Sequence, residues 1–133
     1  MLQQFIPHLI KDLELGDLSL ASDTPGTYVL PFEDGFSIHM KELANQGFIL
    51  KCSLPSCPKD KEELFYTQAM LGNLFGQGTH DAILGLNADA TQLTLTRVVD
   101  YPVEYKDFKD ILEDFINTSD LWREEAVNPS LLK

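Results

Sequence analysis

The sequence predicts an α+β fold, with a mainly antiparallel five-stranded sheet and three helices in the order α-β-β-β-α-β-β-α. Apolar residues recur at helical spacing in three segments of the chain, and two groups of strand-like segments lie between them. Strands grouped together and separated from the helices are typical of α+β folds. The chain has 133 residues, about the length of one domain, so residues 1–133 are expected to form a single domain.

The first helix is expected over residues 2–14, where the apolar residues are Leu2, Phe5, Ile6, Leu9, Ile10 and Leu13. Pro7 lies inside this segment. Because proline is tolerated in the first turn of a helix, the regular part is expected to begin only near that residue. Gly16 is expected to end the helix. The apolar surface of this segment is nearly two-sided, and surplus apolar surface in a small domain favours oligomerisation or partner binding.

Three strands are expected next, over residues 27–32, 36–41 and 48–54. Pro31 has no N–H group, so the first of them should be an edge strand. Turns are expected at residues 33–35 and 45–47, which both contain glycine. Apolar and polar residues alternate in the second and third strands, which predicts one buried face made of Phe36, Ile38, Met40, Phe48, Leu50, Cys52 and Leu54.

The second helix is expected over residues 59–76, and its apolar residues cover more than one narrow stripe. A helix that is apolar on two sides needs two surfaces to pack on. One would be its own sheet, and the other would be a second subunit. The glycines of residues 76–78 should end this helix, and the last two strands are expected over residues 82–86 and 93–99.

The final helix is predicted by the helical spacing of Phe108, Ile111, Leu112, Phe115 and Trp122. Its opposite face is acidic and carries Asp107, Asp110, Glu113 and Asp114. Such a face is most often simply solvated. The functional alternative is a docking surface for a basic partner.

The chain is strongly acidic, with 21 Asp and Glu residues against 10 Lys and Arg residues and a formal net charge of −11. A field of this sign repels phosphate backbones, which argues against nucleic acid as a partner. The first residues show no signal-peptide pattern, and no apolar run approaches the roughly 20 residues that span a bilayer. We therefore expect a cytosolic protein with no membrane partner and with reduced cysteines.

The sequence shows no catalytic residues, metal site or cofactor site, so we do not expect an enzyme. Cys52 and Cys57 lack the Cys-x-x-Cys spacing, and no second pair of ligands exists. The Gly-rich residues 76–79 lack the Lys-Ser/Thr of a phosphate-binding loop. Three histidines lie on different elements without metal-ligand spacing: His8, His39 and His80.

Three stretches of the second half carry a resemblance to a known family: residues 74–79 (Leu-Phe-Gly-Gln-Gly-Thr), 82–86 (Ala-Ile-Leu-Gly-Leu) and 93–96 (Leu-Thr-Leu-Thr). The closing segment from Tyr105 to Arg123 fits as well. The chain resembles the class I type III secretion chaperones of the CesT/SycE (Tir chaperone) family. The resemblance covers almost the whole order of elements, although Pro7 departs from the family's uninterrupted first helix.

The resemblance implies a function. Such chaperones bind the N-terminal segment of effector proteins in extended form in the bacterial cytoplasm, and they keep the effectors soluble and competent for the secretion apparatus. They are homodimers, with occasional heterodimers of two related chaperones. By resemblance, the dimer-interface candidates are Leu71, Leu74, Phe75, Ile83, Leu84, Gly85 and Leu86. The cargo-binding candidates are Phe5, Leu9, Leu13, Leu20, Val29, Leu30 and Phe32, and a cargo strand could also pair with the edge at residues 27–32.

Two other functions compete with this interpretation. The same acidic fold could be a regulatory module that sequesters a transcription factor or a surface of RNA polymerase. A stable complex with polymerase subunits in the absence of effectors would favour it. A small enzyme is the third possibility, and the lack of a convergent catalytic set argues against it.

Overall fold

The computed structural model describes residues 2–16, 20, 24–33, 36–56, 59–73, 81–86 and 92–127, with the side chains of Phe32 and Glu33 left out. The described elements follow the predicted order, with a short 3-10 helix added before the second helix. They are α1 (Leu2–Asp12), β1 (Thr27–Glu33), β2 (Phe36–Glu42), β3 (Phe48–Ser53), η1 (Lys59–Lys61), α2 (Glu62–Asn73), β4 (Ile83–Leu86), β5 (Leu93–Val99) and α3 (Tyr105–Val127).

The five strands form one antiparallel sheet in the order β1-β2-β3-β5-β4. The strand that contains Pro31 lies at one edge, as predicted, and β4 lies at the other. The turn at Asn45–Gly47 also forms as expected, with Gln46 at a φ of +69° and the N–H of Leu43 bonded to the carbonyl of Gly47. These observations confirm the predicted α+β class and its mainly antiparallel sheet.

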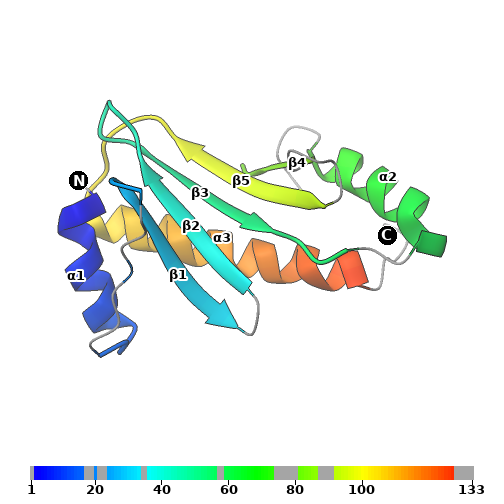
Figure 1. Cartoon of the computed structure of the whole chain (residues 1–133). Helices are drawn as coiled ribbons and strands as arrows, with labels where there is room; N and C mark the ends of the chain where they lie inside the picture. Colours follow the sequence, from blue (N-terminus) through cyan, green and yellow to red (C-terminus); the bar gives the residue numbers. More distant parts are fainter. Residues whose placement is uncertain are drawn as a thin grey trace.

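The long helix α3 runs behind the sheet in Figure 1 and covers one of its faces. The seven residues predicted for the buried face of β2 and β3 are all buried. Phe48 of β3 and Phe108 of α3 meet with their ring centroids 5.1 Å apart. The core therefore lies between the sheet and the apolar side of α3, while the four predicted acidic residues of α3 are exposed.

Helix α1 begins at Leu2 and runs through Pro7, which corrects the expectation that it begins near the proline. The N–H of Leu2 donates to the carboxylate of Glu42 at 3.0 Å, and a negative charge at a helix N-terminus is stabilising. Pro7 cannot donate to the carbonyl of Gln3. Both residues are exposed, so water can reach that side of the helix.

The sequence predicts that Gly16 ends α1, but Glu14 ends the helix instead. Glu14 has a φ of +55° and donates its N–H to the carbonyl of Lys11, while Leu15 donates to the carbonyl of Ile10. These two bonds form a Schellman motif, which usually places glycine where Glu14 stands. Gly16, with a φ of +66°, turns the chain after the helix has ended.

Helix α2 packs against the C-terminal part of α3. The ring centroids of Phe65 and Trp122 are 6.4 Å apart. Gly72 lies directly over the Trp122 ring, where an added Cβ would come within 2.5 Å of the Cζ2 atom. This close approach brings α2 to the β4 end of the sheet and leaves its other side exposed (Figure 1).

Candidate functional site

An apolar surface extends over α2 and β4, and we call it the α2–β4 surface. It consists of exposed or half-exposed side chains from the two elements: Tyr66, Met70, Leu71, Ile83 and Leu86. Met70 is 76% exposed and Ile83 is 60% exposed, which is unusual for large apolar side chains. Several exposed apolar side chains on two packed elements are typical of a binding or assembly site.

A cavity of about 440 Å³ lies within this surface, between the helix and the edge strand. Its lining is mostly apolar, and it consists of Tyr66, Ala69, Met70, Asn73, Leu84, Gly85, Leu86 and Leu93. A volume of this size accommodates one or two large apolar side chains of a partner, or a small ligand. The cavity is therefore suited to holding apolar groups rather than to performing chemistry.

Asn73 at the end of α2 joins the helix to the edge of β4. Its side-chain amide donates to the carbonyl of Leu84 at 2.9 Å, and its Oδ1 accepts from the N–H of Leu84 at 2.8 Å. Leu84 lies opposite Leu95 of β5 and turns these two backbone groups away from the sheet. Asn73 thus takes the place that the next strand would take. Sequence reasoning missed this residue, because a lone Asn near a helix end carries no signal for a partner 11 positions away.

The predicted interface residues fall into three groups. Leu71 of α2 is exposed, and so are Ile83 and Leu86 of β4. Leu84 is 5% exposed and belongs to the core, while Gly85 is half-buried in the strand. Leu74 and Phe75 lie outside the described residues. The assignment of this set to a subunit interface stays a prediction.

The predicted cargo-binding residues divide differently. Four of them are buried among the described residues of the core, and these are Phe5, Leu9, Leu20 and Leu30. Leu13 is 39% exposed and Val29 is half-buried. The side chain of Phe32 lies outside the description. The cargo assignment stays a prediction, but the four buried residues could touch a cargo chain only if the elements that cover them moved.

The edge of β1 offers few backbone donors to an added strand. Thr27, Val29 and Pro31 alternate along its outer side. The N–H of Thr27 donates to Thr24 at 3.2 Å, and that of Val29 donates to Leu20 at 2.7 Å. Pro31 has no N–H. The expected pairing of a cargo strand with residues 27–32 would therefore have to displace existing bonds.

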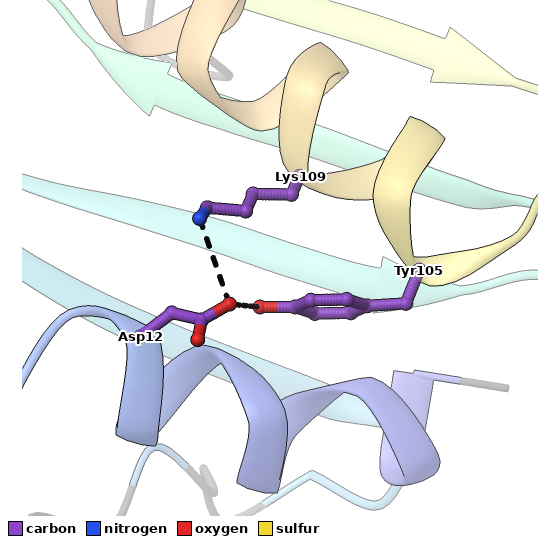
Figure 2. Close-up of polar contacts among 3 residues, drawn as sticks. All are labelled: Asp12, Tyr105 and Lys109. Atoms are coloured by element: carbon purple, nitrogen blue, oxygen red, sulfur yellow. Dashed lines mark hydrogen bonds and ion pairs between the residues drawn. The ribbon is translucent and has the colours of Figure 1, made fainter.

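A polar contact joins α1 to the start of α3 (Figure 2). The hydroxyl of Tyr105 donates to the carboxylate of Asp12 at 2.7 Å, and the Lys109 ammonium lies 3.6 Å from the same oxygen. The Tyr105 hydrogen bond and the positive charge of Lys109 hold the pKa of Asp12 below its usual value. Burial and the adjacent carboxylate raise the pKa of Tyr105. The contact holds α1 on α3, beside the ring pair of Phe5 and Tyr105 at 5.7 Å.

The described residues offer little to catalysis. Burial raises the pKa of the Cys52 thiol to about 12, so it is not a nucleophile at neutral pH. Cys57, His80 and the Gly-rich residues 76–79 lie outside the description. Within the described ranges, no three His, Cys, Asp or Glu side chains gather as metal ligands. No helix in the same ranges has the length and apolar character to span a bilayer.

Both a family profile and a known protein match this sequence over most of its length. The sequence profile of the Tir chaperone protein (CesT) family matches residues 4–123. A protein of Chlamydia pneumoniae is 31% identical over 105 residues, which cover 78% of this chain and 80% of the relative. The profile covers most of the chain and includes every described helix and strand except for a few terminal residues.

Solved structures share the fold. The ExsC–ExsE complex matches with a TM-score of 0.74 at 15% identity, over 97% of this chain and 96% of the matched chain. The ExoU–SpcU complex of the Pseudomonas aeruginosa type III secretion system matches with a TM-score of 0.68 at 16% identity, over 98% and 100%. The HopA1–SchA chaperone–effector complex matches with a TM-score of 0.65 at 18% identity, over 90% and 94%. At these identities the likeness establishes the shared fold.

Proposed function

Because the chain belongs to the Tir chaperone (CesT) family, we propose that it is a type III secretion chaperone that binds an effector protein before export. The family profile over residues 4–123 is the observation that carries this proposal. The similar HopA1–SchA structure is a chaperone–effector complex, which supports an effector as the partner here. The cargo would be its N-terminal segment, held in an extended form that stays soluble and ready for the secretion apparatus.

The physical features of the chain suit such a role. Affinity would come from apolar contacts and from main-chain pairing, neither of which demands one cargo sequence. The net charge of −11 would keep a protein with exposed apolar surface dispersed in the bacterial cytoplasm. With this role the chain holds its cargo without turning it over, and residues 1–133 act as one chaperone domain.

We further propose that two copies associate through the α2–β4 surface. Its exposed apolar side chains come from adjacent elements, and three of them, Tyr66, Met70 and Leu86, line a cavity of about 440 Å³. Met70, exposed by 76%, is a flexible side chain that could enter the cavity of a second copy. A two-fold arrangement would bury the same surface on both copies, which is the usual geometry of homodimers. A related chaperone with a similar surface could replace one copy.

Capture followed by reconstitution tests the chaperone function. The tagged full chain is expressed in its native bacterium, and co-purified proteins are identified by mass spectrometry. Each captured protein is then mixed as a purified N-terminal segment with the purified chain. We expect a secreted protein whose N-terminal segment binds directly and exchanges its amide hydrogens as an extended chain. Recovery of polymerase or transcription-factor subunits alone, with no secreted protein, would contradict the proposal and favour a regulatory module.

A further inference from the structure

The face of the sheet opposite α3 differs in charge from the rest of the molecule. In Figure 1 the strands pass in front of α3, and no labelled helix crosses the near face of β2, β3 and β5. The strand registers place two rows of side chains on this outer face. One row runs Val29, His39, Lys51 and Thr96, and the second runs Thr27, Lys41, Ile49 and Val98.

Two lysines stand on this face without acidic neighbours among the described strand positions. Lys41 and Lys51 are exposed, and neither forms an ion pair with any residue that the structure describes. The described strand positions that project from this face include no Asp or Glu. The chain has a net charge of −11, and its described carboxylates lie elsewhere, for example on the exposed side of α3.

Apolar side chains lie between the positive charges. Lys41 is directly opposite Ile49, which is directly opposite Val98 on β5. Val98 is 49% exposed, and Ile49 is half-buried. Side chains directly opposite one another on neighbouring strands are about 5 Å apart, so an extended segment that crosses the strands would meet basic and apolar side chains within a few residues.

We propose that the outer face of β2, β3 and β5 binds an extended acidic segment in which carboxylates alternate with apolar residues. This inference rests on the proposed chaperone function and names the chemistry of the cargo segment. Lys41 and Lys51 pair with its carboxylates, and Ile49 and Val98 contact its apolar side chains. A long polyanion fits less well, because the net charge of −11 repels it at a distance while a short segment meets only the local positive face.

Designed peptides test this inference without the natural cargo. Three extended 12-residue peptides carry the same apolar residues and differ only in the alternating positions, which are all Glu, all Gln or all Lys. Binding to the full-length chain is measured by fluorescence anisotropy at about 0.1 M salt, where a Debye length of about 10 Å screens the distant charges but leaves close ion pairs. Exposed ion pairs are individually weak, so we expect the two pairs together to make the Glu peptide bind roughly 2- to 30-fold more tightly than the Gln peptide. The Lys peptide should not compete with the Glu peptide for this face, and about 0.5 M salt should remove the difference between the Glu and Gln peptides.

A matched pair of variants locates the binding. Lys41→Glu with Lys51→Glu should abolish or reverse the preference for the Glu peptide. Lys59→Glu with Lys106→Glu makes the same change in net charge at exposed positions of η1 and α3, and it should keep the preference. An equal loss in both variants, or no preference for Glu in the unmodified chain, would overturn the inference.

Two further measurements separate this inference from its alternatives. Vesicles containing 30% phosphatidylserine should not bind the chain, and vesicle binding that requires Lys41 and Lys51 would instead assign the face to a membrane and overturn the inference. Capture of secreted proteins is repeated with the Lys41→Glu, Lys51→Glu variant. Undiminished capture would overturn the role of this face and leave the chaperone function standing. If the chain binds no secreted protein at all, the chaperone function fails, even if the peptide preference persists.

Discussion

The side chain of Asn73 makes both backbone hydrogen bonds that Leu84 directs away from the sheet, at 2.8 and 2.9 Å. One amide thereby closes the free edge of β4 at its middle and fixes the end of α2 beside it. Free strand edges invite pairing with other chains. A second subunit that approaches here therefore meets the side chains of the α2–β4 surface, because the Leu84 backbone groups are already bonded.

Replacing Asn73 should destabilise the protein. Asn73→Leu removes two hydrogen bonds and leaves the N–H and carbonyl of Leu84 without their partner, so we expect the free energy of unfolding to fall by about 1–3 kcal/mol. Urea denaturation followed by circular dichroism measures the loss. Asn117→Leu, at an exposed position of α3, is the matched control and should change stability little. Equal effects of the two substitutions would reject the role assigned to Asn73.

The α2–β4 surface can be tested for self-association. Ile83→Asp places a charge at a position that is 60% exposed in one copy, so the monomer should still fold while a dimer through this surface is lost. Sedimentation velocity measures the oligomeric state. Leu121→Asp, at a position of α3 that is 49% exposed, should leave that state unchanged. A dimer that persists in the Ile83 variant would remove this surface from the interface. Leu84→Asp is less informative, because Leu84 is in the core.

The contact between α2 and α3 depends on the absence of a side chain at Gly72. In Gly72→Ala the new Cβ would come within 2.5 Å of the Trp122 ring, so the helices must separate or the indole must move. We expect a loss of about 1–3 kcal/mol, even though alanine is the better helix former. Gly85→Ala is the control, because its nearest neighbour would be Thr94 Oγ1 at 4.0 Å. Thermal denaturation measures the stability of the two variants. A Gly72→Ala protein as stable as the unmodified chain would contradict the close contact of Gly72 with the Trp122 ring.

The contact between Asp12 and Tyr105 should make stability depend on pH in two windows. The pKa of Tyr105 is raised on folding. The Tyr105 hydroxyl therefore contributes its full share of folding stability below the pKa of about 10 that tyrosine has in the unfolded chain, and this share is lost as pH rises through the pKa in the folded chain. The pKa of Asp12 is lowered on folding. The Asp12 carboxylate therefore contributes to folding stability above the pKa of about 3.9 that Asp has in the unfolded chain, and this contribution is lost as pH falls through the pKa in the folded chain.

Tyr105→Phe tests the alkaline window. Its stability deficit relative to the unmodified chain should be constant between about pH 6 and 9 and should shrink above about pH 10. Asp12→Asn should show a deficit near neutral pH that shrinks below about pH 4. Tyr101→Phe, at a position that is 52% exposed, is the control for the loss of a tyrosine hydroxyl elsewhere on the chain. A Tyr105→Phe deficit that does not change with pH would mean that the hydroxyl contributes no bond to Asp12.

Much of the fold could be predicted from the sequence because periodicity is a local property. The alternation in β2 and β3 identified every buried residue of those strands, and Pro31 placed β1 at an edge. The helix boundaries were less predictable. Pro7 lies within α1 because its side of the helix is exposed, and Glu14 ends the helix where glycine would be the usual residue. Apolar periodicity contains neither the exposure of Gln3 and Pro7 to water nor the backbone bonds of Glu14 and Leu15 that end the helix.

The candidate surfaces were harder to predict. An apolar residue in an amphipathic pattern is expected to be covered, but the pattern does not say which element covers it. Phe5 and Leu9 are apolar and helical, and so is Leu71. The first two are buried among the described residues of the core, whereas Leu71 is 52% exposed. No such pattern could indicate the bonds of Asn73 to Leu84, which require α2 and β4 to be in place first.

The sequence by itself determined the elements, their order, the acidic character of the chain and, through its family resemblance, the kind of protein to expect. Only the tertiary structure decided which apolar side chains remain exposed, which strand edges are already bonded and where positive charges stand without acidic neighbours on the described strands. The physical reason is that periodicity acts over a few residues of one segment. Exposure and charge environment depend instead on segments far apart in the chain, which only the packing of the sheet and helices brings together.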